Sequence, residues 1–264
     1  MILLYIPVLI ASLSVNNLDL SQTPVYNQAY QENYDADTMN VLLNEARGAY
    51  VLLDPFYDNV IEYIPKLKSY RNHIGGYISV GTGENWRDDF GELEPYLTKK
   101  VWGEWAGEYY VSQTTGALAI MKHRINKMAI WGLDWVEFDN MDWLNTESKA
   151  EYGLEASEVE STAYINALCA YTHEKGMKCM AKNTVEGFEH FDGVLYESYH
   201  KEKNWWDTEG TKRFIKEEKP VIINHYNENN CDGVYAEYKT FYQTENILFI
   251  CEDTNIQKYK HYHQ

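Results

Sequence analysis

The segment Leu-Asp-Trp-Val-Glu-Phe-Asp, residues 133–139, is a mostly apolar run that ends on a carboxylate. Runs of this kind are typical of parallel strands that are buried on both faces. Six further runs occur at residues 50–54, 76–81, 177–183, 193–197, 221–226 and 247–251. The series predicts an α/β fold built around a parallel sheet.

Helical patterns lie between most of these runs, at residues 60–70, 116–131, 156–175, 211–216 and 233–242. In the second of them, apolar side chains from Leu118 to Met128 form one stripe, as in a helix that covers a sheet. A short strand near residues 25–30 would be the eighth, so we expect a single-domain (β/α)8 TIM barrel. The alternative is an open doubly wound sheet, but the Gly-Thr-Gly at residues 81–83 lacks the third glycine of its phosphate-binding fingerprint.

Residues 1–14 form an apolar run that ends in small residues, and we expect a signal peptide followed by a domain at residues 15–264. The run is too short to span a bilayer. A buried first strand is the alternative, although Pro7 would interrupt its hydrogen bonding. The oxidising compartment of a secreted protein also suits the four cysteines, for which three pairings or four free thiols stay open: Cys169, Cys179, Cys231 and Cys251.

The chain is strongly acidic, with 40 acidic residues against 23 basic ones and a formal net charge of −17. This charge repels nucleic acid and anionic membranes, so we expect neither as a partner. It attracts polycations, although acidity also keeps secreted proteins soluble. Asp139 and Asp142 would need further converging oxygens to hold a cation. We expect the chain to be a monomer, with no metal ion and no cofactor.

Polar residues gather where the apolar runs end. They are Asp54, Glu84, Arg87, Glu137, Asp139, Asn140, Asp142, Lys182, Asn183, Glu197, His225, Asn227, Glu252 and Asp253. The carboxyl ends of barrel strands open onto one face, where active sites lie, so these residues predict a shared polar pocket. No Gly-x-Ser-x-Gly elbow and no His-Glu-x-x-His pair is present. Two facing carboxyl groups are what glycosidic cleavage requires.

Five motifs occur in order: GYISVGTGENWRDD at 76–89, WAGEY at 105–109, EFDNMD at 137–142, AKN at 181–183 and YES at 196–198. Together they resemble the motifs of glycoside hydrolase family 114, the endo-α-1,4-polygalactosaminidases. The resemblance implies a (β/α)8 barrel, an endo-acting glycosidase, and Asp139 and Glu197 as its catalytic pair. The chain departs from the family pattern at Ala106 and Phe138, which replace prolines, and Tyr199 lies near the position of a missing cysteine.

By analogy with barrels that retain configuration at α-linkages, we expect Asp139 to be the nucleophile and Glu197 the acid/base. Glu197 then needs a raised pKa, which a less polar pocket of aromatic neighbours would supply. The candidate neighbours are Tyr196, Tyr199 and Trp205. Lys182 and the amides of Asn140 or Asn183 would keep Asp139 ionised.

The predicted substrate-binding residues are Asp54, Tyr77, Glu84, Arg87, Trp105, Glu108, Glu137, Asn140, Asp142, Lys182, Asn183, Tyr199 and His225. Arg87 is as well suited to holding Glu84 or Asp54 in place as it is to contacting the sugar. Trp105 and Tyr77 are suited to stacking on sugar or to filling the barrel mouth. The expected partner is a cationic amino-sugar polysaccharide. The alternatives are a catalytically silent glycan-binding barrel, a hydrolase of another α-linked or amino-sugar glycan, and a metal-dependent hydrolase.

Overall fold

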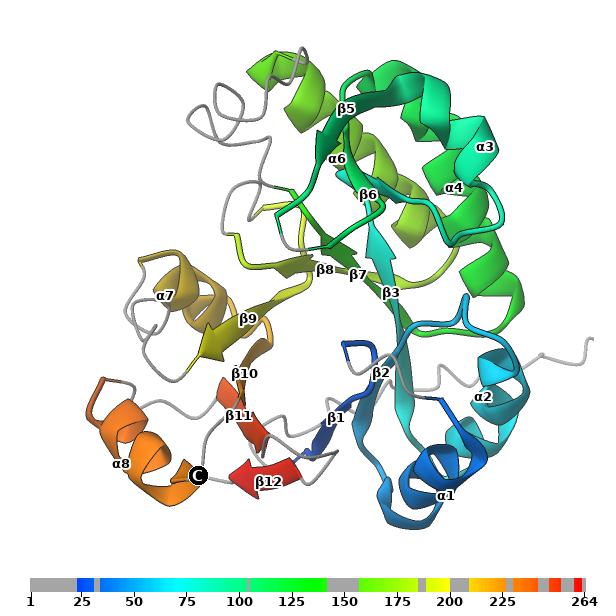
Figure 1. Cartoon of the computed structure of the whole chain (residues 1–264). Coiled ribbons are helices and arrows are strands. Elements are labelled where there is room, and N and C mark those ends of the chain that lie inside the picture. The colour runs from blue at the N-terminus through cyan, green and yellow to red at the C-terminus, as the bar shows by residue number, and fades with distance from the viewer. Residues whose placement is uncertain are drawn as a thin grey trace, which may run out of the picture.

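The computed structural model describes residues 23–30, 34–103, 105–141, 157–184, 189–199, 209–226, 230–241, 247–252 and 259–262. Strands form the centre of the molecule and helices surround them (Figure 1). The strands of the main sheet are β1 (Val25–Asn27), β2 (Tyr50–Leu53), β3 (His73–Ser79), β7 (Trp135–Asp139), β8 (Lys178–Lys182), β9 (Gly193–Tyr199), β10 (Val221–Tyr226), β11 (Ile247–Glu252) and β12 (Tyr259–Tyr262). They pair in chain order, from β1 to β12.

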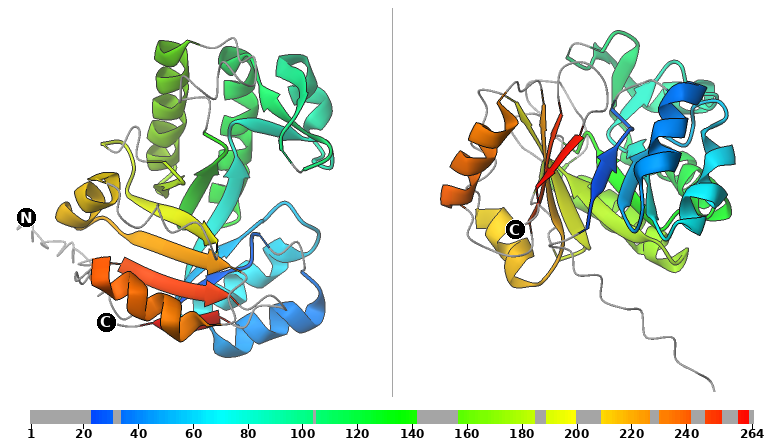
Figure 2. Two further views of the ribbon diagram at one scale, coloured as in Figure 1. Left: turned by 60° about the vertical axis from the view of Figure 1, so that its left-hand side comes forward. Right: turned by 90° about the horizontal axis from the view of Figure 1, so that it is seen from below.

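Eight of these strands, β1 to β11, are parallel and curl into a nearly closed barrel. This confirms the predicted TIM-barrel fold and rules out the open doubly wound sheet. The seven apolar runs all form strands, and the short segment near residues 25–30 supplies β1. The sequence analysis did not predict β12, which pairs antiparallel with β11. Figures 1 and 2 place β12 between β11 and β1, where the barrel closes.

The outer helices of at least eight residues are α1 (Ala36–Glu45), α2 (Val60–Ser69), α4 (Thr114–Ile130), α6 (Glu158–Glu174), α7 (Glu209–Lys216) and α8 (Cys231–Phe241). The predicted helices agree with five of them to within two residues, and α1 was not predicted. Local sequence explains where α6 begins, because the Ser157 hydroxyl accepts the Glu160 N–H while the Glu160 carboxylate accepts the Ser157 N–H. In α1, Asp35 caps the helix in the same way through the N–H of Thr38.

Apolar side chains fill the lower part of the barrel interior. They are Val25, Ala29, Leu52, Trp135, Met180, Leu195, Ile222, Leu248 and Ile250. The indole of Trp135 lies directly against Gly75, where a Cβ atom would overlap it. The buried polar side chains Glu137, Asp139 and Lys182 lie toward the other end of the barrel, at the carboxyl ends of the strands.

A small antiparallel sheet is inserted between β3 and α4. It consists of β4 (Thr82–Glu84), β5 (Leu97–Val101) and β6 (Glu108–Val111) in the order β4-β6-β5. The short helix α3 (Phe90–Leu93) and the 3₁₀ turn Glu94–Tyr96 lie between β4 and β5. The strand predicted at residues 76–81 differs from β3 at both ends, since β3 begins at His73 and ends at Ser79. The insertion places Glu84 directly opposite Glu108.

Two disulfides join helices to the barrel. Cys169–Cys179 connects α6 to β8, and Cys231–Cys251 connects α8 to β11. The sequence left three disulfide pairings and four free thiols open. The structure has the pairing Cys169–Cys179 and Cys231–Cys251. None of the helices in the described ranges has the length and apolarity needed to cross a membrane.

Candidate active site

Three charged side chains meet at the mouth of the barrel. Asp139 ends β7, Lys182 ends β8 and Glu197 lies in β9. The Lys182 ammonium is 2.9 Å from Asp139 Oδ2 and 3.1 Å from Glu197 Oε2, so these two oxygens lie within about 6 Å of each other. The Asp139 and Glu197 side chains keep 12% and 16% of their surface exposed. The cluster is therefore mostly buried, and its two carboxylates are only partly accessible to solvent.

Asp139 is oriented through both of its carboxylate oxygens. The Tyr77 hydroxyl donates to Oδ2 at 2.9 Å, and the backbone N–H of Asn140 donates to Oδ1 at 2.7 Å. Asn140 has a left-handed backbone with φ of 56°, a conformation that asparagine adopts more readily than most residues. The turn directly after β7 thus aims its N–H back at the carboxylate.

Glu197 is held in a similar way by the residue that follows β8. The Asn183 side-chain amide donates to Glu197 Oε2 at 2.8 Å, and its carbonyl oxygen accepts the backbone N–H of Glu197 at 2.8 Å. Asn183 also has a left-handed backbone, with φ of 55°. Both carboxylates are therefore positioned by an asparagine in a backbone conformation that occurs often at functional sites.

Lys182 is surrounded by carboxylates and aromatic rings. Burial alone would lower the pKa of Lys182, but the negative charges of Asp139, Glu197 and Glu137 outweigh it and raise the pKa above its ordinary range. The ammonium also lies 3.9 Å from the centre of the Tyr30 ring, a distance at which a cation is attracted to the ring face. Lys182 therefore carries a permanent positive charge between the two carboxylates.

Glu137 lies below this cluster and is fully buried. Burial raises the pKa of the Glu137 carboxyl to about 8, although the charge of Lys182 and the Tyr30 hydrogen bond act in the opposite direction. The Tyr30 hydroxyl lies 2.7 Å from both Glu137 oxygens. Glu137 therefore holds its proton more tightly than an exposed glutamate does.

Glu108 supports Asp139 from the inserted sheet. Its carboxylate accepts the side-chain amide of Asn140 at 2.8 Å and the hydroxyl of Thr82. Asn140 also donates to Ser79 at 3.0 Å. Burial raises the pKa of Glu108 to about 7. Since Glu108 is buried and bonded to Asn140, it positions the turn after β7.

Arg87 belongs to an ion-pair network that joins the barrel to the insertion. Its guanidinium bonds to Asp54 at 2.5 and 3.0 Å and to Glu84 at 2.6 Å. Arg124 of α4 lies 3.4 Å from the other Glu84 oxygen and 2.6 Å from Asp89. The Arg87 side chain is only 7% exposed, so its charge is committed to these carboxylates.

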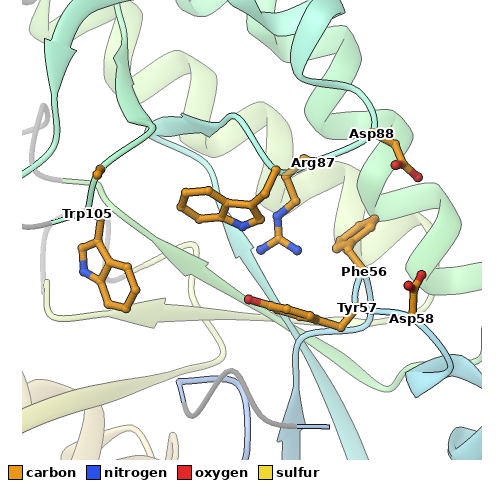
Figure 3. Close-up of a pocket in the computed structure, with 8 residues that line it drawn as sticks. Phe56, Tyr57, Asp58, Arg87, Asp88 and Trp105 are labelled. Atoms are coloured by element: carbon orange, nitrogen blue, oxygen red, sulfur yellow. The ribbon is translucent and has the colours of Figure 1, made fainter. Parts of the chain in front are cut away.

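A pocket of about 540 Å³ opens beside this network (Figure 3). It is lined by residues from three loops: Phe56, Tyr57, Asp58, Trp86, Arg87, Asp88, Trp105 and Ala106. The loops follow β2, β4 and β5. In Figure 3 the Tyr57 ring lies beside the Arg87 guanidinium, and Asp58 and Asp88 lie at the end away from Trp105. The volume falls in the range of small-ligand sites.

The sequence profile of glycoside-hydrolase family GH114 matches residues 21–264. The chain belongs to this family. The GH114 barrel resembles the crystal structure of Aspergillus fumigatus Ega3 in complex with galactosamine, with 18% identity and a TM-score of 0.71 over 92% of this chain and 96% of Ega3. It also resembles the glycoside hydrolase domain of Pseudomonas aeruginosa PelA, with 13% identity and a TM-score of 0.62 over 91% and 97% of the two chains. No curated protein sequence matches.

A more distant likeness is to the alpha-N-acetylgalactosaminidase NagBb from Bifidobacterium bifidum in its GalNAc complex. The identity is 12% and the TM-score 0.51, over 78% of this chain and 41% of NagBb. At identities this low, the likeness to all three structures shows a shared fold only.

Most of the predicted site residues of the GH114 chain lie at the carboxyl-end face. The catalytic candidates and their neighbours form the cluster described above: Tyr77, Glu137, Asp139, Asn140, Lys182, Asn183 and Glu197. Asp54, Glu84 and Arg87 form the ion-pair network, Glu108 supports Asn140, and Trp105 lines the pocket. Asp142 and the side chain of Tyr199 lie outside the described residues.

His225 was predicted to bind substrate, but it points to the helix layer. Its ring is fully buried and stacks on Phe249 at 6.3 Å, and Phe249 packs against Tyr238 of α8. The neighbouring residue Asn224 is the one on the inward face, beside Glu197 in the strand register. Because successive residues of a strand point to opposite faces, His225 lies outside the barrel interior and Asn224 lies inside it.

Three further residues at the face escaped the sequence analysis: Tyr30, Arg124 and Asn224. Tyr30 follows the short β1, whose signal was weak. Arg124 lies inside α4, where an arginine is expected to face solvent. Asn224 is fully buried, and neither of its amide atoms has a hydrogen-bond partner among the described residues. A polar residue within an apolar run was the signal that could have identified it.

Proposed function

We propose that this chain is a secreted, endo-acting glycoside hydrolase that cleaves α-1,4-linked galactosamine-containing polysaccharide. The observation that carries the proposal is the pair of carboxylates, Asp139 and Glu197, on either side of one ammonium group at the barrel mouth. Membership in GH114 supports hydrolysis of a glycosidic bond, and the galactosamine bound to Ega3 supports an amino-sugar substrate. The two disulfides support an extracellular location, with residues 1–14 as the signal peptide.

In the proposed reaction, Glu197 donates a proton to the glycosidic oxygen while Asp139 attacks the anomeric carbon. The C–O bond breaks, and a covalent glycosyl–Asp139 intermediate forms. Glu197 then takes a proton from a water molecule, whose oxygen attacks the same carbon and releases Asp139. Lys182 bonds to both groups and keeps them at a fixed distance.

The spacing of the carboxylates favours retention of configuration. Retaining glycosidases place the two groups about 5–5.5 Å apart, whereas inverting enzymes need about 6.5–9.5 Å to admit a water molecule between them. The two oxygens bonded to Lys182 lie within about 6 Å. We therefore expect the first product to have the α configuration of the substrate, which proton NMR of the fresh digest will show.

The test is release of reducing ends from partly de-N-acetylated α-1,4-galactosamine polymer. We expect release by the wild type, and a loss of at least about a thousandfold in Asp139→Asn and Glu197→Gln, as when one member of a catalytic pair is removed. Glu174→Gln, a change at an exposed residue of α6, is the matched control and should retain full activity.

The two variants must keep the wild-type melting temperature to within a few degrees, which separates loss of chemistry from loss of fold. Binding of the polymer without release by the wild type would contradict the proposal and favour a catalytically silent glycan-binding barrel. Release from another amino-sugar glycan alone would keep the hydrolase and change its substrate.

A further inference from the structure

The walls of the 540 Å³ pocket come from loops that the barrel core does not bury. Trp86 and Trp105 are 42% and 44% exposed, among the most exposed large apolar side chains of the described residues. Packing against the core therefore does not account for either indole. Large exposed aromatic side chains that gather around a hollow commonly mark a binding site.

One backbone hydrogen bond joins the two tryptophan loops, and another closes the turn that carries Trp105. The N–H of Asn85 donates to the carbonyl of Gly107 at 2.9 Å, and the N–H of Trp105 donates to Trp102 at 3.0 Å. Gly107 has a positive φ of 97°, and a Cβ atom at this position would overlap the Asn85 side chain. The rings at the pocket are thus carried by a pair of turns that only glycine allows to come this close.

The charge that the pocket presents to solvent is negative. Arg87 lies in the pocket wall, but its guanidinium is paired with Asp54 and Glu84 and is mostly buried. The exposed charged groups are Asp58 and Asp88, which lie at one end of the pocket (Figure 3). Carboxylates next to aromatic faces form the kind of site that binds an organic ammonium group, since both attract a cation.

We propose that this pocket is a second sugar-binding subsite, which holds a galactosamine unit of the polymer at a distance from the bond that is cleaved. A sugar ring stacks on Trp86, and its ammonium group lies near Asp58 and Asp88. The inference rests on the proposed amino-sugar substrate and extends it. Because the pocket lies on the β2 side of the barrel mouth and Glu197 lies on β9, a polymer that fills both contacts the enzyme at two separated places.

The experiment measures the affinity of de-N-acetylated α-1,4-galactosamine oligosaccharides of increasing length by calorimetry. It uses the Asp139→Asn enzyme, which does not consume the ligand. We expect affinity to rise with length until the oligosaccharide reaches the pocket. Trp86→Ala should then weaken binding of the long oligosaccharide about 5- to 30-fold. Ile130→Ala, at an exposed site on α4, is the control for loss of an apolar side chain.

The charge of the subsite is tested by Asp58→Asn combined with Asp88→Asn. We expect affinity for the long de-N-acetylated oligosaccharide to fall about two- to fivefold, and affinity for the fully N-acetylated one to stay the same. Unchanged affinity in both variants would overturn the inference even if the wild type cleaves the polymer. If the wild type binds these oligosaccharides but cleaves none, the proposed function fails while the subsite is still tested.

Discussion

Glu108 illustrates how a residue can serve a catalytic carboxylate without touching the substrate. Its bond to the Asn140 side chain holds the turn whose N–H donates to Asp139. We expect Glu108→Ala to lower kcat about tenfold with little change in KM, since Asn140 loses its acceptor. Glu108→Gln should recover most of kcat because its amide oxygen still accepts both bonds. Steady-state kinetics on the polymer test this positioning role of Glu108. If Glu108 contacted the substrate directly, KM would rise in both variants.

We expect the buried Glu137 carboxyl to make the free energy of unfolding depend on pH. Burial raises its pKa to about 8 from an ordinary value of 4.5, so the folded state binds the proton more tightly than the unfolded state. The resulting stabilisation is complete below about pH 4.5 and is lost as the pH rises to 8, at no more than about 1.4 kcal/mol per pH unit. Glu137→Gln does not ionise, so we expect its stability relative to the wild type to increase between pH 5 and pH 8.

Urea unfolding at several pH values measures this difference. Ile130→Ala, at an exposed residue of α4 that does not ionise, should differ from the wild type by the same small amount at every pH. A constant difference for Glu137→Gln as well would contradict the raised pKa.

At the scale of single elements, β3 depends on a glycine inside the barrel. A Cβ atom on Gly75 would overlap the Trp135 indole, which packs with the other interior side chains. We expect Gly75→Ala to lower the free energy of unfolding by about 1–3 kcal/mol, the usual cost of overpacking. Gly91→Ala in α3 is the matched control, because a Cβ atom there meets open space. Equal melting temperatures of the two variants would show that β3 and β7 can move apart at no cost.

At the scale of the whole molecule, the net charge of −17 is expected to assist binding of a cationic polymer. The range of such attraction falls from about 30 Å at 0.01 M salt to about 10 Å at 0.1 M. We therefore predict that KM for the de-N-acetylated polymer rises roughly three- to tenfold over this interval. KM for a fully N-acetylated substrate should stay constant. A salt-independent KM on both polymers would mean that the acidity serves solubility alone.

The sequence by itself determined the strands of the barrel and the end at which the site lies. An apolar run that ends on a carboxylate, as in β7 and β9, places that carboxylate near the mouth whatever the surrounding packing, because parallel strands share one direction. Asp139, Lys182 and Glu197 could be predicted as neighbours for this reason. The helices followed from their periodicity, except for α1.

Only the tertiary structure decided which face each residue occupies and which distant residues meet. In β10 both faces are apolar, so the sequence could not show that Asn224 points inward and His225 outward. Tyr30 reaches Glu137 across 107 positions of sequence, and Arg124 meets Glu84 across 40. Such contacts arise from barrel closure and helix packing, which bring together segments whose local patterns carry no information about each other.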